Sequence, residues 1–570
     1  MAYDRSQERL NSLSITSFVK AKDATSAVRT TWRIPREMVL TVLGYTIGLD
    51  NIWKIAYLIL KYQSVIAIIP YALAFLLCGL PLFLIEMIVG QNYQRGPTIV
   101  FARMCPLFHG VGGAMITLCF FMSIFHVVPM VWGLHYFINS FQPVLPWTTC
   151  NNTWNTNHCI SVNDINKDIV GVLSSNEYFR NQVLDLTTNP LLPGAVKIDM
   201  AVYLVICWLM VYLVSFKGIF VSGKASYVTT ALSYLIIVIL FIRGLAAPGN
   251  IAGITKFLWK SNITSLQNIE LWGDASLQAM VSLGVGFGPI ITYSSYNKRD
   301  YKFISRFGVA IPAVNFATSI LFCFTLLLNI GSLLGSRPVL INQITSDETG
   351  LIGSMLVFVV YPTSVGVLQL GHLWSAMFYL MIFLIAFDNQ CAFSESIASG
   401  LIDAFPDQLY NRRTMIYLVL TLVQYLLGMT CITKGGLYVF QLFDWYVMKI
   451  CLPCVLIFEV FIACWIYGVK RLRKDFSVIA GEKLSILWKI LWYIPTPLIV
   501  TGTTLFCVIF YSSPGSNVKF AQYWWSLLTG WLMAGSILVC ILISVILSFI
   551  RAKGSIVQNA SVMDNRQKLN

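Results

Sequence analysis

Charge is scarce in this chain. Charged residues make up 11% of the 570 positions, hydrophobic residues make up 57%, and the mean hydropathy is +0.72. This balance excludes an ordinary soluble domain and predicts an all-α polytopic membrane protein. The five histidines show no metal-ligand spacing and no nucleophile motif appears, so the sequence does not suggest an enzyme. No low-complexity linker divides the chain either, which favours one membrane domain.

Apolar runs of about 20 residues, the length that crosses a bilayer, predict roughly twelve transmembrane helices. We expect a tail at 1–37, a membrane domain at 38–550 and a second tail at 551–570. The expected spans are 38–60, 66–90, 111–141, 198–215, 225–243, 272–296, 306–334, 373–400, 414–431, 437–467, 485–512 and 522–550.

The net charge of +14 does not indicate a nucleic-acid partner, because the basic residues gather in particular segments. The segment 142–197 holds three Lys/Arg against four Asp/Glu. This positive-inside pattern predicts that both tails are cytoplasmic and that 142–197 is a large extracellular loop of a plasma-membrane protein. The first 37 residues contain no apolar core of a cleavable signal peptide. The basic segments are Lys20–Arg36, Lys298–Arg306, Arg412–Arg413 and Lys470–Lys474.

Two of the 14 cysteines stand apart from those in apolar spans. Cys150 and Cys159 lie in the loop predicted to be outside, where an oxidising environment favours a disulfide. Asn151 and Asn262 begin glycosylation sequons in segments also predicted to be outside. Asn559 begins a third sequon, but it lies in the predicted cytoplasmic tail and should be unused.

Two of the expected spans are interrupted by residues that suit a helix break. The first carries Gly-Tyr-Thr-Ile-Gly-Leu-Asp-Asn at 44–51, and the second carries Ser-Leu-Gly-Val-Gly-Phe-Gly-Pro at 282–289. Lipid offers no partner to free backbone groups, so such breaks make sense where backbone faces an ion or a ligand. Paired interrupted spans point to the binding site of a secondary transporter. Spans one to five and six to ten would then form two inverted five-helix repeats, each beginning with a broken helix.

Several motifs together resemble the neurotransmitter:sodium symporter family, solute carrier family 6. The resemblance runs from about residue 29 to about residue 550, and the loop around the two outer cysteines is most similar to the neurotransmitter and glycine-type branches. The motifs are Gly44–Lys54, Gly79–Glu86 with Gly90 and Gln91, Leu145–Trp147 with Trp154, Ser282–Gly288, Ser295–Lys298, Asp388–Gln390 with Glu395, and Asp403–Pro406.

The resemblance implies a first sodium site made of oxygen ligands, the kind that hard cations prefer. The ligands would be the carbonyl of Thr46 and the side chains of Asn51, Ser282 and Asn315. The alternative for Asn315 is an ordinary interhelical hydrogen bond.

A second sodium site is implied beside the same broken helix. Its ligands would be the carbonyls of Gly44, Ile47 and Ile385, with the side chains of Asp388 and Asn389. A carboxylate inside an apolar span, as at Asp388, is by default functional. The family usually has a hydroxyl at the position of Asn389, so this site departs from the family pattern.

A chloride site is implied by four residues that carry hydrogen-bond donors: Tyr71, Gln278, Ser282 and Ser319. A carboxylate at Ser319 would suggest a chloride-independent member of the family, and none is present. We therefore expect chloride dependence if the protein transports.

The family closes its outer side with an Arg–carboxylate pair, and the matching residues here are Lys54 and Asp444. Lysine keeps the charge but loses the bidentate fork, so this gate should be looser. On the inner side, Arg29 beside Trp32 would pair with Asp403. The alternative for each of these charges is an ordinary residue at the membrane interface.

The expected substrate pocket departs most from the family pattern. His126 stands where the family has a tyrosine, and Phe287 keeps the family aromatic. Gly48 occupies the position of an aspartate in monoamine carriers, which favours an amino-acid-like pocket. Asp50 replaces a glycine in the expected unwound turn, where it would repel an anionic substrate group. It could instead pair with His126, with Lys54 or with a cationic substrate.

Two functions follow from these expectations. The first is a sodium- and chloride-coupled symporter that carries a small amino acid or related amine across a lipid bilayer by alternating access. The second is a transport-deficient relative that acts through partners or trafficking. The second is motivated by four departures that gather at the working site: Asp50, Lys54, His126 and Asn389.

Overall fold

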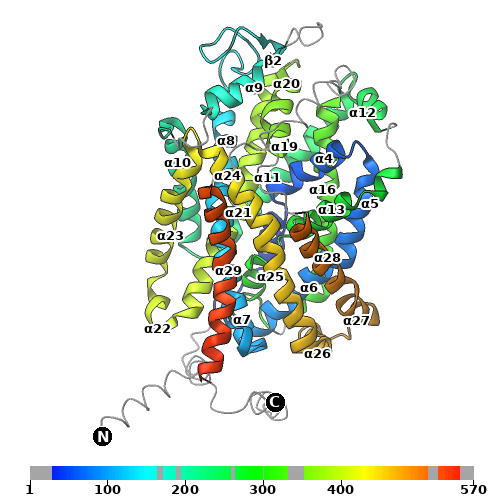
Figure 1. Cartoon of the computed structure of the whole chain (residues 1–570), viewed down its shortest axis with the longest axis vertical. Coiled ribbons are helices and arrows are strands. Elements are labelled where there is room, and N and C mark those ends of the chain that lie inside the picture. Colours follow the sequence, from blue (N-terminus) through cyan, green and yellow to red (C-terminus); the bar gives the residue numbers. More distant parts are fainter. Residues whose placement is uncertain are drawn as a thin grey trace.

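The chain folds into an elongated bundle of helices in a computed structural model (Figure 1). The structure describes residues 29–162, 171–187, 194–258, 263–299, 301–331, 352–366, 368–510 and 524–551. Strand is confined, within these residues, to β1 (Cys159–Ile160) and β2 (Val172–Leu173), which pair in parallel with Cys159 opposite Val172.

The helices of the first half alternate long apolar segments with short connecting turns. They are α3 (Pro35–Thr46), α4 (Leu49–Lys61), η1 (Val65–Ala67), α5 (Ile68–Ala74), η2 (Phe75–Gly79), α6 (Leu80–Tyr93), α7 (Pro97–Met104), η3 (Pro106–Phe108), α8 (Gly110–Asn139), α9 (Ser174–Glu177), η5 (Tyr178–Val183), α10 (Ile198–Ser215), α11 (Ile219–Ala246), α12 (Asn250–Leu258) and η6 (Ile263–Gln267).

The second half continues in the same way. Its helices are α13 (Ile269–Leu283), α14 (Pro289–Ser294), α15 (Phe303–Phe307), α16 (Ala310–Asn329), α19 (Ile352–Met355), η7 (Leu356–Val360), α20 (Tyr361–Gly366), α21 (Gly371–Ala404), α22 (Pro406–Leu409), η8 (Tyr410–Arg412), α23 (Arg413–Gly428), η9 (Met429–Ile432), α24 (Gly436–Tyr446), η10 (Val447–Cys451), α25 (Leu452–Val460), η11 (Phe461–Gly468), α26 (Val469–Ala480), α27 (Ile486–Tyr493), α28 (Pro495–Ile509) and α29 (Trp524–Arg551).

Ten continuous helical segments of the described chain are long and apolar enough to cross a membrane. The first and sixth expected spans are not among them, because each is divided into two shorter helices: α3 with α4, and α13 with α14. Ten continuous spans and two broken ones account for the roughly twelve that the apolar runs predict. The chain is therefore an all-α polytopic membrane protein.

The two breaks have local causes in the sequence. Between α3 and α4 the chain leaves the helix at Ile47 and Gly48, and Gly48 is extended. After α13, Gly284 takes φ +67°, a left-handed conformation that suits glycine, and Pro289 begins α14. The Gly286 N–H donates to a carboxylate oxygen of Glu86 at 2.6 Å, which satisfies one backbone group that the break frees.

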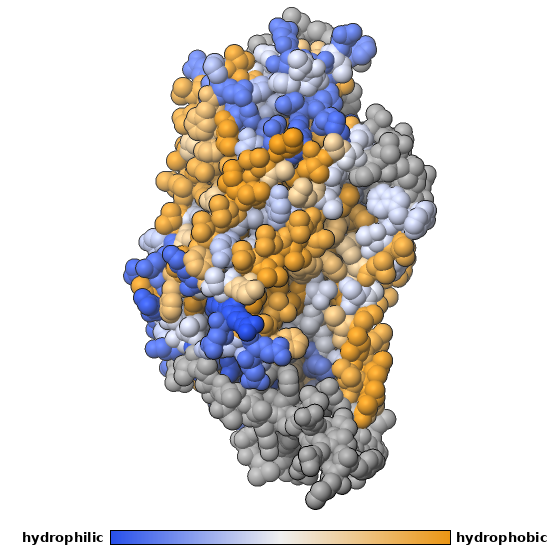
Figure 2. Space-filling model, turned by 90° about the vertical axis from the view of Figure 1, so that its left-hand side faces the viewer, coloured by the Kyte–Doolittle hydropathy of each residue, from blue (hydrophilic) through white to orange (hydrophobic). Residues whose placement is uncertain are grey.

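The surface of the bundle suits a bilayer. Figure 2 shows hydrophobic residues across the middle of the visible face, with hydrophilic residues gathered above and below them. Leu209, Leu422 and Leu542, on α10, α23 and α29, are each at least half exposed. The long helices α8 and α21 pack against each other inside and are mostly buried. Lipid-facing helices thus surround a buried pair, as expected for a membrane domain.

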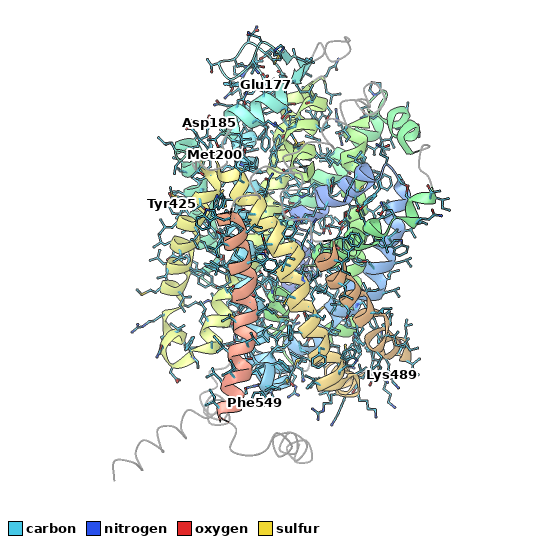
Figure 3. All side chains as sticks on the ribbon, viewed as in Figure 1. Glu177, Asp185, Met200, Tyr425, Lys489 and Phe549 are labelled. Carbon is cyan, nitrogen blue, oxygen red and sulfur yellow. A yellow bond between two sulfur atoms is a disulfide. The ribbon has the colours of Figure 1, made fainter. Side chains whose placement is uncertain are left out.

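The two ends of the bundle differ in chemistry. Figure 3 places Glu177 and Asp185 at one end, with β2, α9 and α20, and Lys489 near the other end, with α26 and α27. Following the predicted orientation, we call these the outer and the inner end.

A short helical element at the outer end is not expected from the sequence. α19, η7 and α20 form an apolar segment too short to span a bilayer, and they pack against α4 and α9. The Tyr136 hydroxyl donates to the Phe358 carbonyl at 2.9 Å, which ties this segment to α8. It covers the outer side of the first broken helix.

The outer loop is held by the predicted disulfide. Cys150 and Cys159 are bonded, with their Cα atoms 5.8 Å apart. The buried Glu177 carboxylate accepts from the Thr156 N–H at 2.9 Å and from the Asn155 amide at 3.1 Å. Asn151 is exposed, as a glycosylation site requires, and Asn262 lies outside the described residues.

We expect the single substitution Cys150→Ala to lower delivery to the cell surface. It leaves the Cys159 thiol alone in an oxidising compartment, where it can form wrong bridges. Surface biotinylation measures the effect, and Cys454→Ala, at a free and partly buried cysteine, is the control. Equal maturation of the single mutant, the Cys150→Ala/Cys159→Ala double mutant and the wild type would contradict this expectation.

Candidate transport site

The two broken helices meet α16 at the residues expected for the first sodium site. The Thr46 carbonyl accepts from the Asn51 and Asn315 amide nitrogens, each at 2.8 Å. The Ser282 carbonyl accepts from the same two amides, at 3.3 and 3.2 Å. Asn315 therefore makes interhelical hydrogen bonds, which is the alternative to ion binding. It also lies among the other residues expected to bind the ion.

One oxygen in this cluster stands out. The Asn51 Oδ1 atom is buried and has no hydrogen-bond partner in the described part of the chain. A buried polar atom without a partner is costly, and an amide oxygen among carbonyls and a hydroxyl suits a hard cation. The residues present therefore fit a sodium ion.

The carboxylate expected at the second sodium site is buried on α21 and is held by hydroxyl groups from α11. Thr229 Oγ1 donates to the two oxygens of Asp388, at 2.7 and 2.8 Å, and Thr230 Oγ1 lies 3.1 Å from Oδ2. These two threonines are not among the ligands that the family resemblance implies. The only feature of the sequence that could have identified them is the presence of hydroxyl side chains in a largely apolar span.

The side-chain amide of the neighbouring Asn389 faces backbone carbonyl groups of the first broken helix. Its amide is satisfied when the nitrogen donates to the Tyr45 carbonyl at 2.9 Å and to the Gly44 carbonyl at 3.3 Å. Gly44 is itself one of the expected ligands, so this amide uses a carbonyl that the family pattern reserves for the ion.

Of the four residues expected at the chloride site, Tyr71, Ser282 and Ser319 lie together. The Tyr71 hydroxyl lies 3.0 Å from Ser282 Oγ and also hydrogen-bonds Ser319. Gln278 donates from its amide to the Asp50 carbonyl at 3.3 Å. All four side chains carry donors, which an anion needs.

The expected outer gate is a chain of three charges. Lys54 Nζ lies 2.7 Å from Asp50 Oδ1 and 3.7 Å from Asp444 Oδ1. The expectation that Asp50 lies in the unwound turn is wrong, because α4 begins at Leu49 and Asp50 therefore lies in its first turn. Residues four apart on a helix are neighbours, and therefore Asp50 pairs with Lys54 and not with His126.

The expected pocket residues lie around the aromatic ring of Phe393. The His126 ring meets it edge-on at 5.6 Å between centroids, and Phe287 lies 6.3 Å from it. His126 is buried, and neither of its ring nitrogens has a hydrogen-bond partner within the described residues. Gly48 lies against Asn389, four residues before Phe393 on α21. Phe393 is not among the expected pocket residues. Its spacing of four residues from Asn389 on one helix is the feature of the sequence that could have identified it.

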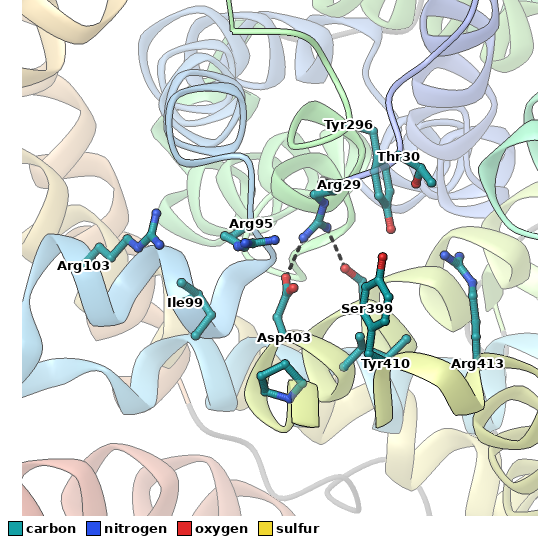
Figure 4. A pocket seen from close by; sticks show the side chains of 12 residues that line it. Arg29, Thr30, Arg95, Ile99, Arg103, Tyr296, Ser399, Asp403, Tyr410 and Arg413 are labelled. Carbon is teal, nitrogen blue, oxygen red and sulfur yellow. Dashed lines mark hydrogen bonds and ion pairs between the residues drawn. The ribbon is translucent and has the colours of Figure 1, made fainter. Parts of the chain in front are cut away.

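The expected inner gate is closed at 2.6 Å between Arg29 and Asp403 (Figure 4). Arg29 also donates to Ser399 Oγ at 2.7 Å and lies over the Tyr296 ring. The Gly96 N–H donates to Asp403 at 2.6 Å, and the Trp32 indole donates to the Tyr293 carbonyl.

A second ion pair lies beside the inner gate and was not expected. Arg413 contacts Glu395 at 2.7 Å, and the Tyr296 hydroxyl donates to the same carboxylate. Both residues of the inner gate and Arg413 of the second pair border a cavity of about 290 Å³, which Arg95 and Arg103 also line (Figure 4).

Two broken helices that converge on buried oxygen atoms, between a closed inner pair and an outer charge chain, define a secondary transporter. The model of the Sodium:neurotransmitter symporter family matches residues 29–552. The chain belongs to this family, and it is a transporter and not an enzyme.

Curated relatives agree with this assignment. The human "Sodium- and chloride-dependent GABA transporter 2" is 33% identical over 518 residues, 90% of this chain and 85% of the relative. The human "Sodium- and chloride-dependent taurine transporter" is 32% identical over 539 residues, 92% of this chain and 86% of the relative. The mouse "Sodium- and chloride-dependent creatine transporter 1" is 29% identical over 549 residues, which are 93% of this chain and 85% of the relative.

We expect Lys54→Gln to lower the melting temperature of the purified protein by several degrees. It leaves the Asp50 carboxylate mostly buried without its partner, which is strongly destabilising. Asp444→Asn is the control and should cost less, since Asp444 is more exposed and farther from Lys54. Asp50→Asn/Lys54→Gln should recover most of the loss. A loss from Asp444→Asn as large as that from Lys54→Gln would contradict this expectation, because the more distant and more exposed pair would then contribute as much as the close one.

Proposed function

We propose that this chain is a sodium- and chloride-coupled symporter of a small zwitterionic amino acid or related amine, working by alternating access. The observation that carries the proposal is the unpaired Asn51 Oδ1 at the break of the first helix, among the Thr46, Ser282 and Asn315 oxygens. An oxygen cluster at a helix break within a span suits a coupling ion.

Coupling to sodium supplies the driving force. Each sodium ion that enters down a membrane potential contributes about 2.3 kcal/mol per 100 mV. The first site would use Thr46, Asn51, Ser282 and Asn315, and the second would be centred on Asp388. A chloride ion at Tyr71, Gln278, Ser282 and Ser319 would balance part of that positive charge, as the names of the relatives suggest.

The pocket charges favour a zwitterionic substrate. Asp50 pairs with Lys54, which weakens its repulsion of an anionic substrate group. A neutral imidazole at His126 can donate one hydrogen bond to an acidic group of the substrate. Phe287 and Phe393 supply apolar walls. The relatives are named for GABA, taurine and creatine, small molecules that each carry an anionic and a cationic group.

In this proposal the two charge clusters act as alternating gates of a plasma-membrane protein with both termini in the cytoplasm. Arg29 and Asp403 close the inner side at 2.6 Å, and Lys54 and Asp444 stand 3.7 Å apart on the outer side. Asn151 and Asn262 would carry glycans outside.

The alternative, a transport-deficient relative, is favoured by the Asn389 amide on the Gly44 and Tyr45 carbonyls. Uptake separates the two functions. Cells expressing the chain are given labelled GABA, taurine, creatine and glycine in sodium chloride, in a sodium-free buffer and in a chloride-free buffer. We expect uptake of at least one substrate only when both ions are present. No uptake above untransfected cells, with normal surface expression, would favour the alternative.

Asp388→Asn should abolish sodium-driven uptake while surface expression stays largely intact. The change keeps the shape of the side chain but removes the buried negative charge that attracts the cation. Asp407→Asn makes the same change at an exposed residue of α22 and is the control. If the sodium dependence of uptake were unchanged in Asp388→Asn, the Asp388 carboxylate would not be a sodium ligand.

Ser319→Glu should make uptake independent of chloride. A fixed carboxylate beside Tyr71 and Ser282 supplies the negative charge that the anion would bring. Ser319→Gln, which is similar in size but neutral, is the control and should stay chloride-dependent. If both variants responded to chloride as the wild type does, the anion would not bind at Ser319.

A further inference from the structure

A cavity beside Asp388 has an unexpected lining. Four of the five residues expected at the second sodium site border it: Gly44, Ile47, Ile385 and Asp388. The fifth, Asn389, does not, and Thr230 of α11 does. The cavity holds about 10 Å³, roughly the room that one water-sized particle needs.

The position of Asn389 explains its absence from the lining. Its amide nitrogen donates to the Tyr45 and Gly44 carbonyls, at 2.9 and 3.3 Å. The end of this amide also lies 2.9 Å from where a Cβ on Gly48 would stand. The side chain is therefore directed along the broken helix, toward Gly48, and offers the cavity no oxygen.

Thr230 is buried, and its hydroxyl lies beside the Asp388 carboxylate. Thr230 Oγ1 lies 3.1 Å from Asp388 Oδ2 and 3.4 Å from the Leu40 carbonyl. A Cβ on Gly44 would come within 2.6 Å of this hydroxyl and 2.9 Å of Asp388 Oδ2. Only glycine at 44 lets the α3 backbone approach both oxygens so closely.

The chemistry of a hydroxyl allows two roles at once. It has one donor and two acceptor lone pairs. Thr230 can give its proton to Asp388 or to the Leu40 carbonyl and keep a lone pair for a cation. An Asn389 amide nitrogen that faces carbonyls has no lone pair to offer.

We infer that Thr230 is the fifth oxygen ligand of the second sodium site and that Asn389 is not a ligand. The inference rests on the proposed function, because it names a residue of the same sodium site. The site then joins three helices, α3, α11 and α21, so the ion would tie α11 to the broken helix. The hydroxyl that the family has at position 389 is supplied here from another helix.

The competing explanation is that Thr230 only hydrogen-bonds Asp388. Thr229 offers a matched comparison, because it precedes Thr230 on α11 and donates to the same carboxylate at 2.7 and 2.8 Å but does not line the cavity. Removing each hydroxyl in turn separates ligation of the ion from support of the carboxylate.

The experiment measures sodium binding by the purified full-length protein in lipid nanodiscs. Sodium chloride replaces choline chloride at constant ionic strength, and the rise in melting temperature gives the half-saturating sodium concentration. Binding of radioactive sodium gives the half-saturating sodium concentration by an independent method. An Asn51→Ala background weakens the first sodium site, so that the remaining response reports the second.

We expect Thr230→Val to raise the half-saturating sodium concentration by about a hundredfold or more, because it removes a ligand of the ion as well as a hydrogen bond to Asp388, and loss of a supporting group alone costs about tenfold or more. Thr230→Ser keeps the hydroxyl and should stay within about threefold of the wild type. Thr229→Val removes only hydrogen bonds to the Asp388 carboxylate and should raise the half-saturating concentration by about tenfold, clearly less than Thr230→Val. Asn389→Ala should leave it nearly unchanged.

Three results would overturn the assignment while leaving sodium coupling intact: no effect of Thr230→Val, a large effect of Asn389→Ala, or equal effects of Thr229→Val and Thr230→Val. If Thr230→Val does not fold, Thr230→Ala removes the same hydroxyl with a smaller side chain, and Asn389→Ala still tests whether Asn389 is a ligand. No response of the wild type to sodium, in a protein that is otherwise folded, would overturn the proposed function together with this site.

Discussion

The constraint on which the rest of this structure depends is that backbone groups freed within a membrane must find partners inside the protein. The break in the first helix is closed by the Asn51 and Asn315 amides on the Thr46 carbonyl. The break in the sixth span is held by Glu86, which accepts from the Gly286 N–H. Each partner comes from a different helix or from beyond the break, so the breaks fix how the central helices pack.

The same constraint favours ion binding. A carbonyl that needs a donor at membrane depth is also an oxygen that a cation can use. An asparagine amide serves both needs, because it donates through its nitrogen and keeps an oxygen. Asn51 does this: its nitrogen bonds the Thr46 carbonyl, and its oxygen has no partner in the described part of the chain. At the proposed sodium site, helix packing and ion coupling would therefore use one set of atoms.

The sequence predicts what depends on apolar length and on compartment: the roughly twelve spans, the two breaks and the disulfide. It misses α19, η7 and α20, because this apolar segment is shorter than a span. It leaves three partners open for Asp50, because the answer depends on where α4 begins. It also misses Thr229 and Thr230, since α11 is far from α21 in sequence and a hydroxyl in a span has many uses.

The four departures from the family pattern are not equivalent. Asp50 and Lys54 form a pair, so each compensates the other. Asn389 is satisfied by two carbonyls of the broken helix. His126 is the exception: it is buried against Phe393, and both ring nitrogens lack a hydrogen-bond partner among the described residues. Since an unpaired buried polar group is costly, we propose that His126 is the residue of this pocket that meets a polar group of the substrate.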